Sequence, residues 1–141
     1  MDDGFAIVDG LACEEKQRRL RLLYANRHRS PKHAAKWSRA FSDSSWIDPG
    51  CIVTDCGRST LEQVTDLLLA DLPPQVEMSI ISEDAAFDGV RGEPGSCLRT
   101  VFGQGQGSLL YTLDHPIAYY EGEGPSDRLL LAPRTAWPVA G

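Results

Sequence analysis

Three residues that could carry out thiol chemistry occur in an order typical of cysteine hydrolases. Asp55-Cys56 lies just before a predicted helix that starts near Ser59. A cysteine near a helix N-terminus has its thiolate stabilised by the helix dipole and by free backbone N–H groups, which can also form an oxyanion hole. His115 follows fifty-nine residues later and Asp127 twelve residues after that, both near predicted strands. One hypothesis is therefore a Cys56 nucleophile, a His115 base and an Asp127 orienting group.

The segments around these residues resemble the NlpC/P60-type papain-fold peptidases. In that family an Asp-Cys pair opens a helix, and a His begins a strand that is followed by an aromatic residue and a glycine-rich turn. The corresponding second segment here is 115–124, HPIAYYEGEG. The resemblance covers two short segments and implies a small thiol hydrolase. The chain departs from the family at Gly57-Arg58, where the family has Ser-Gly.

The glycine-rich run 103–107, GQGQG, resembles the pyrophosphate loop of GNAT acetyltransferases, which lies between a strand and a helix. The basic residue that precedes the glycines in that family is replaced by Phe102, and Pro116 follows too soon for the expected helix. We interpret the run as a hairpin loop between two strands. No motif in the chain indicates a cofactor.

The four cysteines show no metal-binding pattern. No C-x-x-C pair occurs, and no histidine near Cys51 and Cys56 completes a zinc set, so no metal site is predicted. We expect most of these cysteines to be small buried apolar residues.

The charges are unevenly distributed along the chain. The formal net charge is −6, yet the segment 16–39 holds nine basic residues and no acidic one. From Ala40 onward there are five basic and fifteen acidic residues. A basic head and an acidic body are therefore predicted, with either pole able to face a charged partner.

Two binding hypotheses follow from this distribution. An acidic surface would suit a basic protein such as a nuclease-type toxin, and the candidate contacts are Glu83, Asp84, Asp88, Glu121 and Glu123. The basic segment, with Tyr24 and Trp37, would suit a nucleic acid, and its candidate contacts are Lys32, Lys36 and Arg39.

No catalytic motif is complete, and charge is the most distinctive feature of the sequence. The leading hypothesis is therefore a non-enzymatic protein-binding domain, an inhibitor, immunity or regulatory factor that acts on a protein partner by charge complementarity. A small thiol hydrolase and a nucleic-acid-binding module remain the alternatives. The sequence does not indicate an oligomeric state.

The hydrophobic pattern predicts an α+β fold. Helices are predicted over 14–26 and from Ser30-Pro31 to about Phe41, followed by a strand at 51–54, a helix that starts at Ser59 and ends before Pro73-Pro74, and a strand at 76–82. A long polar loop, 83–96, precedes four predicted strands at 97–102, 108–113, 117–121 and 128–132. These strands would form an antiparallel meander.

Length and hydropathy bound the remaining expectations. The chain has 141 residues, close to the commonest domain size, so one globular domain over 1–141 is expected. No stretch approaches the roughly 20 apolar residues of a membrane helix, so we expect no membrane association. Asp2 and Asp3 stand where a signal peptide would carry basic residues, which predicts a cytoplasmic protein.

Overall fold

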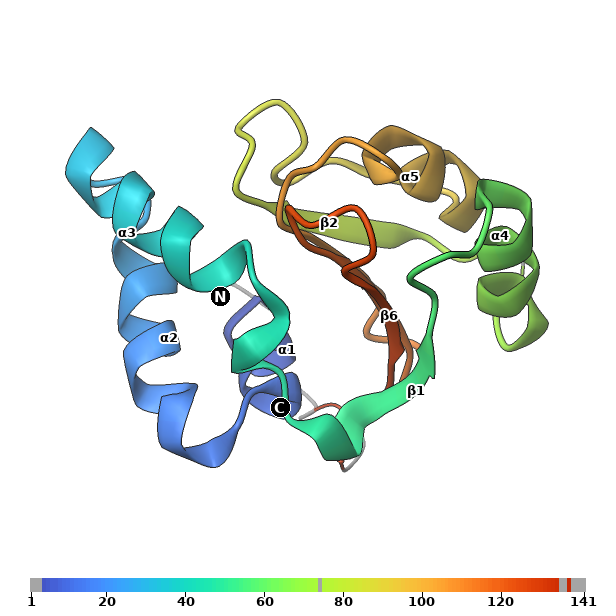
Figure 1. Cartoon of the computed structure of the whole chain (residues 1–141), viewed down its shortest axis with the longest axis horizontal. Helices are drawn as coiled ribbons and strands as arrows, with labels where there is room; N and C mark the ends of the chain where they lie inside the picture. The colour runs from blue at the N-terminus through green and yellow to red at the C-terminus, as the bar shows by residue number, and fades with distance from the viewer. Residues whose placement is uncertain (1–3, 74, 135–136, 138–141) are drawn as a thin grey trace.

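The computed structural model describes residues 4–73, 75–134 and 137 (Figure 1). Three helices come first, followed by two short 3-10 turns: α1 (Gly4–Leu11), α2 (Glu14–Asn26), α3 (Pro31–Phe41), η1 (Ser44–Trp46) and η2 (Pro49–Cys51). Six strands and two further helices complete the fold: β1 (Ile52–Asp55), α4 (Leu61–Ala70), β2 (Met78–Ser82), β3 (Arg91–Gly92), α5 (Pro94–Val101), β4 (Ser108–Tyr111), β5 (Ala118–Glu121) and β6 (Arg128–Leu131). The predicted α+β class is confirmed.

All six strands belong to one antiparallel sheet with the order β1-β6-β5-β4-β2-β3. The C-terminal meander β4-β5-β6 is confirmed, and it separates β1 from β2. The strand–helix–strand unit β1-α4-β2 therefore spans the meander, because its two strands lie on opposite sides of it.

Helices cover both faces of the sheet (Figure 1). Strand side chains alternate between the faces. One row of paired positions packs against α1, α2 and α3, and it consists of Ile81, Leu109, Tyr120 and Leu129. The neighbouring row packs against α4 and α5, and it consists of Ile80, Leu110, Tyr119 and Leu130. Because both faces are buried, the strands contain almost continuous apolar runs.

The helical hairpin α2–α3 follows its local sequence signals. Ser30 caps α3 by accepting a hydrogen bond from the backbone N–H of His33, and Pro31 occupies the first helical position. Trp37 and Phe41 are buried and stack at 4.6 Å between ring centroids. Ala34 and Ala35 are exposed, because the hairpin covers the sheet with one face only.

The end of α3 lies directly against the loops at one end of the sheet. A Cβ added to Gly107 would approach Ser42 Cα to 2.8 Å, and one added to Gly122 would approach the Ser42 carbonyl oxygen to 2.7 Å. Both contacts are closer than a side chain tolerates, so glycine is required at these two positions for α3 to dock. The backbone N–H of Glu123 completes the junction by donating to the same Ser42 carbonyl oxygen.

Three predictions about local structure are wrong. The sequence predicted no element before Cys13, but α1 forms there because Ile7, Val8 and Leu11 pack into the core and outweigh the cost of two glycines. The segment 97–102 is not a strand: residues 97–101 belong to α5, whose buried residues follow helical spacing: Pro94, Cys97, Leu98 and Val101. The run 103–107 consequently joins a helix to β4 instead of forming a hairpin.

Smaller corrections concern caps and loops. Thr60, not Ser59, caps α4, in a capping box with Gln63. The polar stretch 83–96 contains β3 and the first turn of α5. Within the described residues, no helix combines the length and the apolar character that a membrane span requires.

Candidate functional site

Cys56 lies in the interior of the protein. Its side chain is 0% exposed and packs in the core between the sheet and helices α4 and α5. Its thiol donates to the Thr54 carbonyl oxygen at 3.7 Å, and burial raises the pKa of this thiol. Nucleophilic cysteines need a stabilised, accessible thiolate, and these features favour a packed neutral thiol.

His115 and Asp127 lie at opposite ends of β5. His115 is in the turn before β5, where its carbonyl oxygen accepts from the indole N–H of Trp137. Asp127 is in the turn after β5 and accepts from the backbone N–H of Ser44 on the α1–α3 side of the sheet. The backbone of Cys56 lies close to Asp127 in space, because the Cys56 N–H donates to the carbonyl oxygen of the next residue, Arg128. The Cys56 side chain, however, packs on the α4–α5 side of the sheet. The structure gives no hydrogen bond among the three predicted catalytic residues.

Polar side chains are buried together at one end of the sheet, on the face that α4 and α5 cover. Glu121, a predicted partner contact, is 1% exposed. Its carboxylate accepts from the Tyr119 hydroxyl at 2.9 Å, from the Gly103 backbone N–H at 2.8 Å and from Arg128 Nε at 3.1 Å. The Arg128 guanidinium also lies 4.4 Å from the centre of the Phe102 ring. This charge is fully compensated, so the fold uses it internally and does not present it to a partner.

Glu83 and Glu123 form a carboxylate pair on the opposite side of the same sheet end. Glu83 accepts from the backbone N–H of Gly107 at 2.9 Å. Burial, followed by the neighbouring Glu123, raises the pKa of Glu83 to about 6. Glu83 is partly buried, whereas Glu123 is exposed. Glu83 therefore binds its proton at a higher pH than an ordinary glutamate does.

The two other predicted acidic contacts, Asp84 and Asp88, already have partners within the protein. Asp84 caps its own turn by accepting from the backbone N–H of Ala86. Asp88 accepts from the backbone N–H of Ser82 and lies 3.6 Å from Arg27 and 3.5 Å from His28. The loop after β2 is thus connected to the turn between α2 and α3. Part of the opposite charge of head and body is neutralised at this contact.

The basic face of the α2–α3 hairpin remains on the surface. The predicted contacts Lys32, Lys36 and Arg39 are all exposed. Lys36 and Arg39, together with Lys16 and Arg19 of α2, border a groove of about 820 Å³. Within residues 4–73, 75–134 and 137, no acidic side chain forms an ion pair with Arg19, Lys36 or Arg39.

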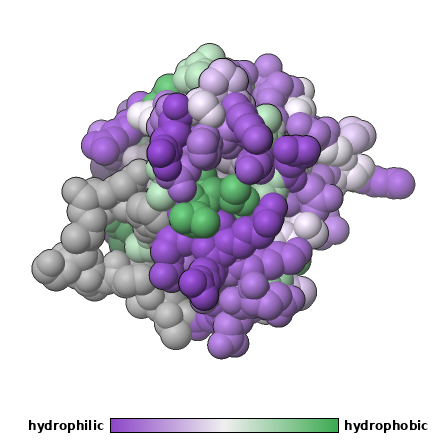
Figure 2. All heavy atoms as spheres, turned by 90° about the vertical axis from the view of Figure 1, so that its left-hand side faces the viewer, coloured by the Kyte–Doolittle hydropathy of each residue, from purple (hydrophilic) through white to green (hydrophobic). Residues whose placement is uncertain are grey.

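The floor of this groove is apolar. It contains Leu20, Leu22 and Leu23 from α2, Ala40 from α3, and Trp46. Leu22 is 65% exposed, the most exposed large apolar side chain described. Figure 2 faces this side of the molecule and shows a small apolar patch enclosed by hydrophilic surface. The groove therefore combines a cationic rim with an apolar floor in which Leu22 is exposed and Leu23 and Ala40 are partly exposed, whereas Leu20 and Trp46 are buried in the core.

Asp43 and Ser45 close one end of the groove. Lys16 reaches across to donate to the Ser45 carbonyl oxygen at 2.8 Å. Hydrogen bonds from Ser45 lower the pKa of the Asp43 carboxyl, and Lys16 lowers it further. The net positive charge of the rim is consequently concentrated on Arg19, Lys36 and Arg39.

The aromatic residues of the basic segment are not available for stacking on bases. Tyr24 and Trp37 are each 2% exposed. They pack edge to face at 5.4 Å and continue into Phe41 in the core. A single-stranded nucleic acid would find phosphate contacts here but no aromatic platform.

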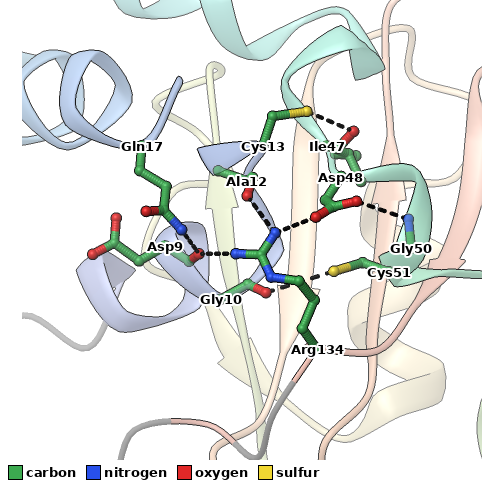
Figure 3. Close-up of polar contacts among 10 residues, drawn as sticks. All are labelled: Asp9, Gly10, Ala12, Cys13, Gln17, Ile47, Asp48, Gly50, Cys51 and Arg134. Carbon is green, nitrogen blue, oxygen red and sulfur yellow. Dashed lines mark hydrogen bonds and ion pairs between the residues drawn. The ribbon is translucent and has the colours of Figure 1, made fainter. Parts of the chain in front are cut away.

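Polar contacts connect the chain between α1 and α2 with the segment 47–51 and with Arg134, at the base of the hairpin (Figure 3). The Arg134 guanidinium donates to the Ala12 carbonyl oxygen at 2.9 Å and to the Asp48 carboxylate. Hydrogen bonds from the Gly50 backbone N–H and from Arg134 lower the pKa of the Asp48 carboxyl. The thiol of Cys13 donates to Ile47 and the thiol of Cys51 to Gly10, so both cysteines serve the same junction. All four cysteines are free thiols.

Sequence reasoning found the rim of the groove but missed its floor. The sequence analysis did not predict an exposed apolar side chain on α2, although a signal was available: Leu20, Leu22, Leu23 and Tyr24 span more of the helix circumference than one buried face requires. Comparisons with protein-family models, curated proteins and solved structures gave no match for this chain.

Proposed function

We propose that this protein is a non-enzymatic protein-binding domain whose binding surface is the groove between α2 and α3. The observation that carries the proposal is the coincidence of an apolar floor with a rim of three cations that have no acidic partner in the described structure. Exposed apolar groups enclosed by charged ones are typical of protein interaction sites.

The charge distribution supports the same proposal. The chain is acidic overall, with a formal net charge of −6, yet the groove is bordered by basic residues. Such a localised field steers an oppositely charged partner to one site and disfavours binding elsewhere. A domain that acts by occupying a partner surface is of the inhibitor, immunity or regulatory kind, and we infer that mode of action here.

Site-specific photo-crosslinking in the producing cell tests the proposal. A benzoylphenylalanine at position 22 should give a discrete cross-linked protein, because Leu22 lies in the groove and is 65% exposed. The same probe at Val90, which is 38% exposed and does not line the groove, is the matched control. The cross-link should disappear in the Lys36→Glu/Arg39→Glu variant. Equal products from both positions, or a product that survives the charge reversal, would contradict the proposal.

A further inference from the structure

The groove has a length and a charge arrangement that narrow the kind of segment it accepts. On α2, Lys16, Leu20 and Leu23 follow at helical spacing along one face. Seven residues of helix rise about 10 Å, so the groove spans about two helical turns. An apolar stripe of the same length is made by residues i, i+3 or i+4, and i+7 of another helix.

Both walls of the groove are helices, and this determines the backbone conformation that suits the occupant. The N–H and C=O groups within α2 and α3 bond inside each helix. They offer no main-chain partners to an extended peptide, which depends on such bonds when it adds to a sheet edge. A bound helix satisfies its own backbone N–H and C=O groups, so it needs no main-chain hydrogen bonds from the groove.

The cations of the groove come from both of its helices. Arg19 is on α2, whereas Lys36 and Arg39 are on α3. A helix bound between α2 and α3 would therefore meet positive charge from both of them. Acidic residues on either side of its apolar stripe would pair with these cations, and basic residues there would be repelled.

We propose that the groove binds an amphipathic helix of a protein partner, with an apolar stripe of about two turns and Asp or Glu on both flanks. This inference rests on the proposed function, because it specifies the partner of the same groove. Acidic residues of the partner contact Arg19, Lys36 and Arg39, and its apolar residues cover the exposed face of Leu22 and Leu23.

Three synthetic peptides of 18 residues test the inference with the full-length protein. The first is a helix with Leu at i, i+3, i+4 and i+7 and Glu on both flanks. The second carries Lys at every Glu position. The third has the composition of the first with the Leu positions scrambled. Measured by fluorescence anisotropy, the first peptide should bind at least about tenfold more tightly than either control, since both the stripe and its charge are required.

Two charge-reversed variants of the protein locate the binding. Lys36→Glu/Arg39→Glu should weaken binding of the acidic helix by at least about tenfold. Arg29→Glu/Lys32→Glu makes the same change in net charge at exposed positions of the same hairpin that do not line the groove. This control should change the affinity by no more than about threefold.

Several results would overturn the inference. They are equal binding of the basic or scrambled peptide, equal effects of the two charge reversals, and no binding of the acidic helix. Binding of phosphatidylserine vesicles or of a single-stranded RNA oligonucleotide with the same dependence on Lys36 and Arg39 would assign the groove to another class of ligand. A groove-dependent protein cross-link at position 22 without acidic-helix binding would retain the proposed function and refute only this inference.

Discussion

Two charged regions of this protein differ in burial and pairing: one is a buried ion pair, and the other is a set of exposed, unpaired cations. At the end of the sheet, Glu121 is 1% exposed and its carboxylate accepts from Arg128 at 3.1 Å, from Tyr119 and from the Gly103 backbone. On the α2–α3 hairpin, Lys36 and Arg39 lie exposed beside an apolar floor and have no acidic partner in the described chain. Charge density along the sequence therefore does not distinguish buried, paired charges from exposed, unpaired ones. Charges paired in the interior maintain the fold, and unpaired charges beside exposed apolar groups are suited to a partner.

The largest expected effect follows from removing the cation of Arg128 at the end of the sheet. Arg128→Met leaves the buried carboxylate of Glu121 without its ion pair. We expect the free energy of unfolding to fall by about 3–5 kcal/mol, the usual cost of an uncompensated buried charge. Urea denaturation followed by circular dichroism measures it.

The double variant Glu121→Gln/Arg128→Met is the control for that loss. Removing both charges should recover at least half of the stability, because the remaining amide oxygen can accept from the Gly103 N–H while the amide NH2 donates to the Tyr119 hydroxyl oxygen. A single-variant loss below about 1 kcal/mol would show that solvent, not Arg128, compensates Glu121.

Cysteine labelling tests whether the sheet end is an interior or a reactive site. At pH 6, Cys56 should react with iodoacetamide at least about a hundredfold more slowly than the half-buried Cys13, since Cys56 is 0% exposed and burial raises the pKa of its thiol. His115→Ala should leave this rate unchanged. Mass spectrometry of the four thiols gives the rates. A Cys56 that reacts faster than Cys13 and slows in His115→Ala would instead support the thiol-hydrolase hypothesis.

Glu83 provides a test of intermediate size. Its folded-state pKa, about 6, lies above the ordinary value of 4.5 because of burial and the neighbouring Glu123. The stability that its proton contributes is therefore complete below about pH 4.5 and is lost as the pH rises through 6. Glu83→Gln should raise the free energy of unfolding at pH 7 by about 1 kcal/mol, after allowance for partial exposure. The gain should vanish at pH 4.5.

Glu77→Gln is the matched control for Glu83, since the Glu77 side chain is 67% exposed. Its stability should follow the wild-type pH dependence between 4.5 and 7. A Glu83→Gln gain that persists at pH 4.5 would assign the effect to packing and not to the proton.

The smallest expected effect on stability belongs to the groove. Lys36→Glu/Arg39→Glu should change the free energy of unfolding by no more than about 0.5 kcal/mol, because both side chains are exposed and their charges support no contact in the described fold. Thermal denaturation at low ionic strength measures this. A loss above about 2 kcal/mol would show that these cations stabilise the hairpin itself.

The sequence predicted helices and strands best where a helix-capping residue and the spacing of the apolar residues indicate the same element. The α2 bounds 14–26 and the Ser30-Pro31 start of α3 were correct, because these signals are local. The helix α5 was mistaken for a strand because Cys97, Val101 and Phe102 are typical of strands, although Pro94 and the burial of Leu98 follow a helical pattern. Packing against α4 and β2 decides that segment, and packing is not a local property.

The candidate site was predicted only in part for the same reason. Lys36 and Arg39 were identified from charge, which needs no tertiary information. The burial of Glu121 depends on a strand register that aligns it with Arg128, and register is not encoded by either residue alone. The exposure of Leu22 depends on where α3 crosses α2, which the helical pattern does not specify.

The position of β6 in the sheet has a consequence for synthesis on the ribosome. Among the described strands, β1 pairs only with β6, although 72 residues separate the last residue of β1, Asp55, from the first of β6, Arg128. The hairpin α2–α3 involves near neighbours and can form early, but the strands β5 and β6 that cover its aromatic face are synthesised later. A nascent chain that ends before residue 128 therefore carries Trp37, Phe41 and Trp46 without their complete cover. Such a chain is a substrate for chaperones that capture exposed apolar surface.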